Sequence, residues 1–311
     1  MIPVGSHPFR GIYAATLLPF TAEGAIDRPL LARHFADCAG VPGIVGVLCN
    51  GHAGENFRLS RVEKRVVVAT AAETIGATSL IVSGIVAETV NEAVEQAQDA
   101  RDAGADALLV FPAFSWAGTQ DADVIVALHA AIAAATDMPI MLYLAPVAGG
   151  LAYAPDLLAR LLQVKGVVGI KEGSWETNAY DRNRRLVARL APQVEVMASG
   201  DEHLLPCFAI GSTGSLVSLA AIIPRAIVAL KAAVDRGDLV QARTLHDDIQ
   251  PLANLIYGNV PASRATARLK ACMVALGHWP SAVTRVAAEA LSPAETQVLI
   301  QALGPAARLD S

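Results

Sequence analysis

Short runs of apolar residues alternate with longer amphipathic stretches from residue 11 onward. Eight of the short runs have the length and composition of buried strands, and the stretches between them have helical periodicity. The predicted strands are residues 12–18, 44–49, 80–85, 107–111, 140–144, 167–171, 194–198 and 215–218. The predicted helices between them are residues 28–39, 61–75, 89–103, 122–135, 155–162, 177–190 and 202–210. This alternation is typical of βα units that build a parallel sheet.

Eight βα units favour a closed (β/α)8 barrel, also called a TIM barrel. An open doubly wound sheet is the alternative, but no GxGxxG segment follows the first predicted strand. Strand signals stop after Pro224, and further helices are predicted at residues 225–236, 239–257, 263–276 and 293–303. We therefore expect a barrel over residues 10–236 that carries the active site. Residues 237–311 should form a C-terminal helical extension packed on the barrel.

Lys171 closes the sixth predicted strand. Period-2 alternation places it on the same face as Val167 and Gly169, which should point inward, at the end of the barrel where function gathers. An amine among apolar neighbours should have a lowered pKa, so that its neutral, nucleophilic form becomes accessible, as a Schiff-base lysine requires. The alternative is a lysine whose stem lies on the strand while its ammonium reaches water.

Two further strand ends bring candidate groups to the same rim. Tyr143, in LYLAP, ends the strand before that of Lys171, and its phenol could move a proton; an aromatic residue that only fills space is the alternative. The second strand runs into CNGHAGE, where the two glycines permit a tight turn whose N–H groups could converge on a carboxylate. The residues of this turn are Gly51, His52, Ala53 and Gly54. His52 is a candidate proton carrier, and a plain turn is the alternative for the whole segment.

Asp201 and Glu202 follow the seventh predicted strand in the segment SGDEH. At the rim, their carboxylates could accept hydrogen bonds from substrate hydroxyls and set the specificity for the distal part of a substrate. The alternative is that Asp201 caps the next helix. No HxH or HExxH spacing is present, so neither a metal nor another cofactor is expected.

Composition narrows the class of protein. Hydrophobic residues make up 53% and charged residues 17% of the 311 residues, which excludes disorder and favours a large core with apolar surface between subunits. The net charge of −5, without a Lys/Arg-rich block, argues against nucleic acid and favours a small-molecule substrate. Four cysteines without a CxxC motif predict a reduced, cytoplasmic setting. No membrane span and no targeting segment are predicted.

Taken in order, the segments GHAGE, FPAFSW, LYLAP, GIKEGS, SGDE and GSTGSLVS resemble the dihydrodipicolinate synthase and N-acetylneuraminate lyase superfamily. The resemblance covers about residues 10–224, and its most specific parts are YxxP and GIKE downstream of GxxGE. It implies a (β/α)8 barrel in which Lys171 forms a Schiff base with a 2-oxo acid, usually pyruvate. Tyr143 would be the catalytic tyrosine, the turn 51–54 would bind the carboxylate, and Leu216 would contribute to substrate binding. It also implies a homotetramer built as a dimer of dimers.

Three positions depart from the pattern of dihydrodipicolinate synthase itself. The synthase turn reads GTTGE, and its two hydroxyls join a proton relay, whereas His52 and Ala53 stand here. The tyrosine that a neighbouring subunit contributes to the relay falls at Phe114, and the arginine that holds the second substrate falls at about Ala148. Three changes in one mechanism argue against synthase activity. The SGDE segment resembles that of the lyase, but the lyase's GSTGE turn is absent.

We therefore predict a Schiff-base-forming lyase of the class I aldolase or dehydratase type. It would act on a 2-oxo acid, either by aldol cleavage and condensation or by dehydration of a keto-deoxy sugar acid. Tyr143 and His52 would move protons. Trp116 and Trp175 would shape or cover the pocket, and packing at a subunit contact is the alternative for these two residues. A non-catalytic 2-oxo-acid sensor and a metal-dependent barrel enzyme are the alternatives. The ligands of such a metal would be drawn from His52, Glu55, Asp201 and His203.

Overall fold

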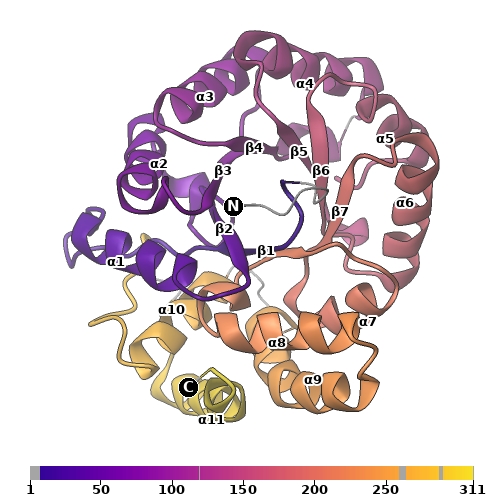
Figure 1. Cartoon of the computed structure of the whole chain (residues 1–311). Coiled ribbons are helices and arrows are strands. Elements are labelled where there is room, and N and C mark those ends of the chain that lie inside the picture. The colour runs from indigo at the N-terminus through magenta and orange to yellow at the C-terminus, as the bar shows by residue number, and fades with distance from the viewer. Residues whose placement is uncertain (1–7, 119, 259–263, 287–289, 311) are drawn as a thin grey trace.

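The structure is a computed structural model that describes residues 8–118, 120–258, 264–286 and 290–310. Eight parallel strands form a closed barrel in sequential order (Figure 1). The strands are β1 Ile12–Ala15, β2 Ile44–Cys49, β3 Leu80–Ile85, β4 Ala107–Val110, β5 Ile140–Leu144, β6 Val167–Glu172, β7 Glu195–Ala198 and β8 Ser215–Val217. Because β8 pairs with β1, the barrel is confirmed and the open sheet is excluded.

Eight helices form a ring around the barrel (Figure 1). They are α1 Arg28–Ala39, α2 Arg61–Ile75, α3 Val90–Asp102, α4 Ala122–Thr136, α5 Pro155–Leu161, α6 Thr177–Leu190, α7 Leu204–Ala209 and α8 Pro224–Asp235. Short 3-10 turns lie on the loops at η1 Asn56–Arg58, η2 Phe114–Ala117, η3 Val147–Gly149, η4 Asp201–His203 and η5 Leu219–Ala221. Helix α2 begins at the capping box formed by Ser60 and Glu63, so that its boundaries follow from local sequence.

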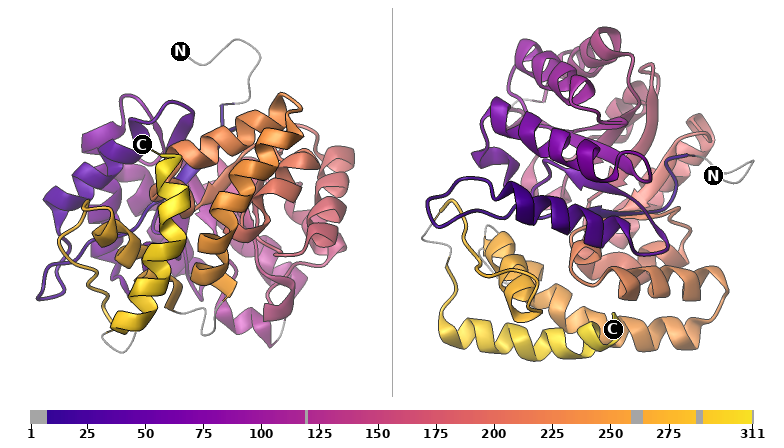
Figure 2. Two further views of the ribbon diagram at one scale, coloured as in Figure 1. Left: turned by 90° about the horizontal axis from the view of Figure 1, so that it is seen from below. Right: turned by 60° about the vertical axis from the view of Figure 1, so that its left-hand side comes forward.

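The helices that follow α8 form a layer on one side of the barrel, drawn in orange to yellow in Figure 2. They are α9 Leu239–Ala253, the π-helical turn η6 Asn254–Gly258, α10 Ala265–Ala275 and α11 Pro293–Arg308, and α11 packs against α9 and α10. The predicted helix 239–257 therefore ends early, in the π-helical turn. The start predicted for the next helix, Ser263, lies outside the described residues.

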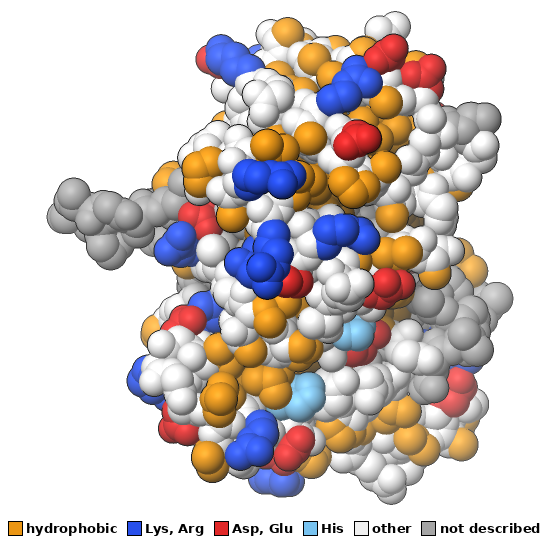
Figure 3. Space-filling view, turned by 90° about the vertical axis from the view of Figure 1, so that its right-hand side faces the viewer, with side chains coloured by type: hydrophobic (Ala, Val, Ile, Leu, Met, Phe, Trp, Pro, Cys, Tyr) orange, Lys and Arg blue, Asp and Glu red, His pale blue; other side chains and the backbone are white. Residues whose placement is uncertain are grey.

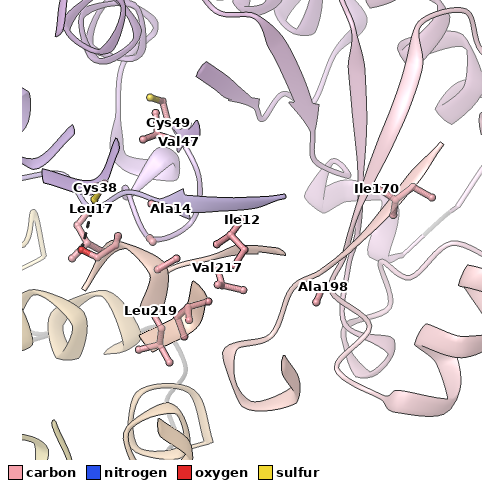
Figure 4. Packing of buried hydrophobic residues seen from close by; sticks show 14 of the residues in the cluster. Ile12, Ala14, Leu17, Cys38, Val47, Cys49, Ile170, Ala198, Val217 and Leu219 are labelled. Carbon is pink, nitrogen blue, oxygen red and sulfur yellow. Dashed lines mark hydrogen bonds between the residues drawn. The ribbon is translucent and has the colours of Figure 1, made fainter. Parts of the chain in front are cut away.

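Side chains of the strands divide into two buried layers. Those that point away from the barrel axis pack beneath the helices, among them Ile12, Ala14, Val47, Cys49 and Ile170 (Figure 4). Those that point inward fill the barrel, among them Tyr13, Leu48, Leu109, Met141, Met197 and Leu216. All four cysteines are buried and unpaired with each other. The filled interior leaves the rim as the place for a site.

Strand β6 carries one residue more than β5 over the same length. Ile140 pairs with Val167, but Met141 pairs with Gly169, so that Val168 forms a bulge. Val167 consequently joins the outer layer. A Cβ on Gly169 would lie 3.4 Å from side-chain atoms of Met141 and Met197 inside the barrel. The prediction that Val167 shares the face of Lys171 is therefore wrong, whereas Gly169 does face inward.

The described surface is mixed in character. On the face shown in Figure 3, basic, acidic and apolar side chains are interspersed. On helix α6, Arg184 and Arg185 form ion pairs with Asp181. Within the described ranges, no helix has the length and apolar character needed to cross a membrane.

Candidate active site

Lys171 and Tyr143 are direct cross-strand partners at the carboxyl ends of β6 and β5. The Lys171 Nζ atom lies 5.6 Å from the centroid of the Tyr143 ring. Both residues are buried, with exposed fractions of 8% and 4%. The structure thus brings together the two residues that the sequence predicted as neighbours.

The environment of the pair makes the neutral amine accessible beside a protonated phenol. Burial lowers the pKa of Lys171 to about 8, although the carboxylate of Asp201 raises it. Burial raises the pKa of Tyr143, and the charge of Glu172 raises it further. Near neutral pH, Lys171 can therefore become a nucleophile while Tyr143 keeps its proton.

The turn after β2 is closed by its own backbone. The N–H of Gly54 donates to the carbonyl of Gly51 at 3.1 Å, and the N–H of Asn56 donates to the same carbonyl at 3.3 Å. The N–H groups of His52 and Ala53 make no backbone hydrogen bond to any described residue. These two donors, rather than that of Gly54, are available to a carboxylate.

The left-handed backbone of this turn lies at Asn50 and Glu55, with φ of 51° and 57°, and not at either glycine. Gly54 serves a different purpose. A Cβ at this position would lie 3.3 Å from the carbonyl oxygen of Thr16, which follows β1. The absence of a side chain at Gly54 therefore lets the turn approach the neighbouring strand end closely.

His52 lies among aromatic rings at the mouth of the site. Its ring centroid is 4.6 Å from that of Phe111 and 5.5 Å from that of Tyr143. The residue reaches solvent, yet the surrounding protein is dense enough for burial to lower the pKa of the imidazole, and the charge of Lys171 lowers it further. His52 is therefore neutral at physiological pH and belongs to the same electrostatic environment as Lys171.

A cavity of about 170 Å³ opens beside the pair. It is lined by His52, Phe57, Phe111, Pro112, Phe114, Tyr143, Ala145, Pro146, Leu151 and Trp175. Lys171 does not line it; the ring of Tyr143 both lines the cavity and lies against the Lys171 amine. Trp116, the other rim tryptophan predicted to shape the pocket, is instead buried in the outer layer.

Asp201 connects the loops after β7 and β8. Its Oδ1 accepts a hydrogen bond from the N–H of Leu219 at 2.6 Å and another from the Ser218 hydroxyl at 3.2 Å. It caps no helix, because His203 occupies the N-cap of α7 without a side-chain bond. Burial raises the pKa of Asp201 to about 7, while the positive charge of Lys171 lowers it. Asp201 and Lys171 therefore influence each other's ionisation.

Glu202, next to Asp201, is only partly buried. Its Oε2 atom is shielded from solvent and accepts no hydrogen bond from the described part of the chain. Burial raises the pKa of this carboxyl group. Glu202 therefore has a shielded oxygen that can accept a hydrogen bond.

Several contacts of the site were not anticipated from the sequence. The hydroxyls of Tyr257 and Ser218 are hydrogen-bonded to each other, and the Tyr257 ring centroid lies 6.4 Å from that of Trp175. Tyr257 comes from the π-helical turn of the C-terminal extension. No local sequence signal connects that turn with the rim of the barrel.

The residues that follow Lys171 in the segment KEGS hold the rim in place. Glu172 accepts hydrogen bonds from the Ser174 hydroxyl at 3.0 Å and from the Asn183 amide at 2.8 Å. A Cβ on Gly173 would lie 3.0 Å from the Tyr143 ring and 2.8 Å from the Leu144 carbonyl oxygen. The order of residues after Lys171 therefore fixes the loop and leaves room for Tyr143.

Leu216, the remaining substrate-binding candidate, is fully buried inside the barrel, and its role in substrate binding stays a prediction.

The metal-dependent alternative requires a group of ligands. Over the described residues, no three His, Cys, Asp or Glu side chains are grouped so that they could hold a metal ion. Glu55, one of the ligands considered, is instead ion-paired with Lys270.

A buried lysine beside a tyrosine at the carboxyl rim of a barrel has the arrangement expected of a Schiff-base-forming lyase of the class I aldolase type. The chain is a member of the dihydrodipicolinate synthetase family, which it matches over residues 8–301. It accordingly acts as a lyase on a 2-oxo acid. This assignment favours the lyase over both the sensor and the metal-dependent enzyme.

Individual relatives agree with the family. The chain is 32% identical over 251 residues to a 4-hydroxy-tetrahydrodipicolinate synthase of Methanothrix thermoacetophila, covering 80% of this chain and 82% of the relative. It is 30% identical to the enzyme of that name from Thermomicrobium roseum, covering 94% and 93%. The crystal structure of dihydrodipicolinate synthase from Agrobacterium tumefaciens superposes with a TM-score of 0.84 at 25% identity, covering 96% and 98%.

Proposed function

We propose that the chain is a pyruvate-type aldolase or dehydratase distinct from 4-hydroxy-tetrahydrodipicolinate synthase, with Lys171 as its Schiff-base residue. The observation that carries the proposal is the buried cross-strand pair of Lys171 and Tyr143, with the lysine pKa near 8. Only the neutral amine can attack a ketone, and this pKa makes it available near neutral pH.

The residues divide the chemistry between them. The N–H groups of His52 and Ala53 bind the carboxylate of the 2-oxo acid, and Lys171 attacks its ketone carbon. Loss of water gives an iminium ion, which acts as an electron sink when a proton leaves the adjacent carbon or when the next carbon-carbon bond breaks. Tyr143 carries the proton to and from the reacting oxygen, and the neutral imidazole of His52 accepts a hydrogen bond at the mouth of the site.

The acidic residues have different tasks in this proposal. Asp201 holds the loop after β8 through Leu219 and raises the pKa of Lys171. Glu202, with its unbonded Oε2 atom, accepts a hydrogen bond from a substrate hydroxyl. Leu216 supports the site from below, within the barrel.

The residues around Lys171 and Tyr143 support an activity other than that of the synthase. His52 and Ala53 supply no hydroxyl, Phe114 supplies a ring without one, and Ala148 is exposed on the η3 turn where a cation would be needed. No lysine or arginine lines the described cavity. Relatives that carry the synthase name share about a third of their residues, and a shared fold can host a different second substrate.

We further propose a cytoplasmic homotetramer, assembled as a dimer of dimers. Phe57 and Phe114 are about half exposed and their ring centroids lie 4.9 Å apart, so that this aromatic pair suits coverage by a second subunit. Four buried, unpaired cysteines suit a reducing compartment. We also propose that residues 237–311 are an extension of the barrel rather than an independent domain, since Lys270 pairs with Glu55.

Borohydride trapping tests the function. Pyruvate and borohydride should add one reduced adduct per chain, which peptide mapping should place on Lys171. Lys171→Ala should abolish it, whereas Lys165→Ala, at an exposed ion-paired lysine, should retain it. An adduct on Lys165 or Lys270 in the wild type would contradict the assignment.

Tyr143→Phe separates binding from turnover. This variant should still form the adduct but lose about 10²- to 10⁴-fold in turnover, because the ring remains while the proton carrier is removed. A wild-type protein that traps pyruvate but turns over no aldehyde or sugar acid would instead be a 2-oxo-acid sensor.

A further inference from the structure

The cavity beside Tyr143 is walled by a continuous series of aromatic contacts. Ring centroids lie 4.9 Å apart for Phe114 and Phe57, 4.8 Å for Phe57 and His52, 4.6 Å for His52 and Phe111, and 4.7 Å for Phe111 and Tyr143. These separations fall in the range of attractive ring packing. The series runs from the exposed mouth to the ring that lies against Lys171.

The rest of the cavity is apolar as well. The remaining lining residues are Pro112, Ala145, Pro146, Leu151 and Trp175. No charged side chain contributes to the described lining. Among the described lining residues, only His52, Tyr143 and Trp175 offer side-chain hydrogen-bonding groups, so a polyhydroxylated or charged group placed there would lose more hydrogen bonds to water than it gains, which is unfavourable.

The size of the cavity fits one aromatic ring. Its volume is about 170 Å³, and an apolar protein cavity of about 150 Å³ is large enough to bind benzene. Ring-walled cavities also favour flat ligands, since offset or edge-to-face packing adds to the gain from burying apolar surface.

We propose that the substrate portion beyond the pyruvyl unit is an aryl group that occupies this cavity, so that the enzyme joins pyruvate to an aromatic aldehyde or cleaves the corresponding product. The inference rests on the proposed Schiff-base function and narrows its substrate class. Tyr143 belongs to both places: its ring contacts the aryl group, and its hydroxyl reaches the carbon at which the bond forms or breaks.

The reaction balances without any further reactant. Lys171 and pyruvate form an imine with loss of water, and removal of a methyl proton gives the enamine. The enamine carbon forms a bond to the aldehyde carbon while the carbonyl π bond breaks, and the resulting alkoxide takes up a proton. Water then hydrolyses the imine, which releases a 4-aryl-4-hydroxy-2-oxobutanoate and regenerates the Lys171 amine.

The loop after β7 has few free hydrogen-bond acceptors for a long hydroxylated substrate. Asp201 Oδ1 already accepts hydrogen bonds from Leu219 and Ser218. Glu202 Oε2 is shielded from solvent and has no hydrogen-bond partner among the described residues. This buried acceptor suits the hydroxyl that the condensation product carries.

The test compares aldehydes with the full-length protein. Wild-type protein is first assayed for the pyruvate adduct on Lys171, and then for condensation of pyruvate with benzaldehyde or glyceraldehyde, with products measured by mass spectrometry. We expect kcat/KM for benzaldehyde to exceed that for glyceraldehyde by about tenfold or more. Trapping of pyruvate together with a preference for glyceraldehyde, or with no turnover of benzaldehyde, would overturn this inference and leave the Schiff-base function standing. Failure to trap pyruvate would overturn both.

Variants of the cavity wall locate the aryl group. Trp175→Ala should lower kcat/KM for benzaldehyde about tenfold, and Trp175→Phe should restore most of it, because the loss of apolar contact is recovered by another ring. Phe57→Ala, half-exposed in the single chain, gives a second measurement from another loop, and gel filtration of this variant shows whether the proposed subunit contact persists. Leu239→Ala, exposed on α9 and outside the cavity lining, is the matched control. Equal loss for Leu239→Ala, or none for either cavity variant, would overturn the placement.

Discussion

Lys270, on α10 of the C-terminal extension, forms an ion pair with Glu55 at the end of the turn that follows β2, and neither side chain has exposed surface. The Lys270 ammonium also donates to the Val283 carbonyl at 2.7 Å and lies 4.3 Å above the ring of Phe20. The N–H of Arg285 donates to Glu55 at 3.2 Å. The extension therefore holds the turn whose N–H groups are proposed to bind the carboxylate.

Lys270→Met should lower the free energy of unfolding by about 3 to 5 kcal/mol, because it leaves the Glu55 carboxylate buried without its buried cation. Urea unfolding of the wild type and the variant measures the difference. The double variant Lys270→Met/Glu55→Gln should recover part of the loss, since it removes a buried charge that would otherwise have only Arg58 as its ion-pair partner among the described residues. A loss below about 1 kcal/mol in the single variant would show that the pair does not secure the turn.

Imine formation should become faster as pH rises from 6 through about 8, the midpoint, and should level off above about pH 9. The neutral amine is the reactive form, and a pKa near 8 leaves about a tenth of Lys171 neutral at pH 7, with the fraction rising through that pKa. Quenched-flow trapping with pyruvate and borohydride at a series of pH values measures the profile.

The Asp201→Asn variant tests the contribution of the Asp201 carboxylate to the pH dependence of imine formation. The Asp201 carboxylate raises the pKa of Lys171, so its removal should move the midpoint to lower pH. The amide oxygen of asparagine can still accept from Leu219. Asp137→Asn, at an exposed residue paired with Lys165, should leave the midpoint in place. A wild-type midpoint near 10 would contradict the buried environment described for Lys171.

With pyruvate and aspartate semialdehyde, the protein should show negligible condensation. The hydroxyls at positions 52 and 53 and the arginine near Ala148 are missing, and the cavity has an apolar lining where a charged second substrate would lie. Coupled detection of the cyclised product gives the rate. Turnover at ordinary enzyme rates, above about 1 per second, would refute the distinction from the synthase.

Asp201→Ala and Glu202→Ala should differ in stability. Asp201→Ala leaves the buried N–H of Leu219 without its acceptor and should lower the free energy of unfolding by about 1 to 3 kcal/mol. Glu202→Ala removes a carboxyl oxygen that has no partner and should change stability by less than about 0.5 kcal/mol. Its effect should instead fall on kcat/KM for the hydroxylated condensation product. If both variants lowered the free energy of unfolding equally, the two residues would both stabilise the fold, and the prediction would be wrong.

Local periodicity predicted much of this molecule. Strands β2 and β3 and helices α1 and α2 have the predicted boundaries, because alternation, capping residues and glycines act within a few positions. The meeting of Tyr143 and Lys171 followed from the same reasoning, since both side chains face inward at the ends of adjacent parallel strands.

Pairings between distant segments could not be found in this way. Lys270 is 215 positions from Glu55, and Tyr257 is 39 positions from Ser218, so no periodic pattern connects them. The bulge at Val168 reversed the orientation expected for Val167. Side chains alternate between the two faces of a strand only where the strand is regular, and a bulge inserts one extra residue. Asp201 was a reasonable cap by residue type, but its carboxylate turns toward the next strand end, which only the closed barrel brings near.

Trp175 lines the cavity, whereas Trp116 and Trp279, the other two tryptophans of the chain, are buried elsewhere with exposed fractions of 6% and 4%. Because of the position of Trp175, the intrinsic fluorescence of the protein should report on what occupies the cavity. Indole emission depends on the polarity and the quenchers around the ring, so a molecule that enters the cavity alters the light emitted by this tryptophan against a constant background from the other two. Occupancy can therefore be followed in real time, without a label and without turnover.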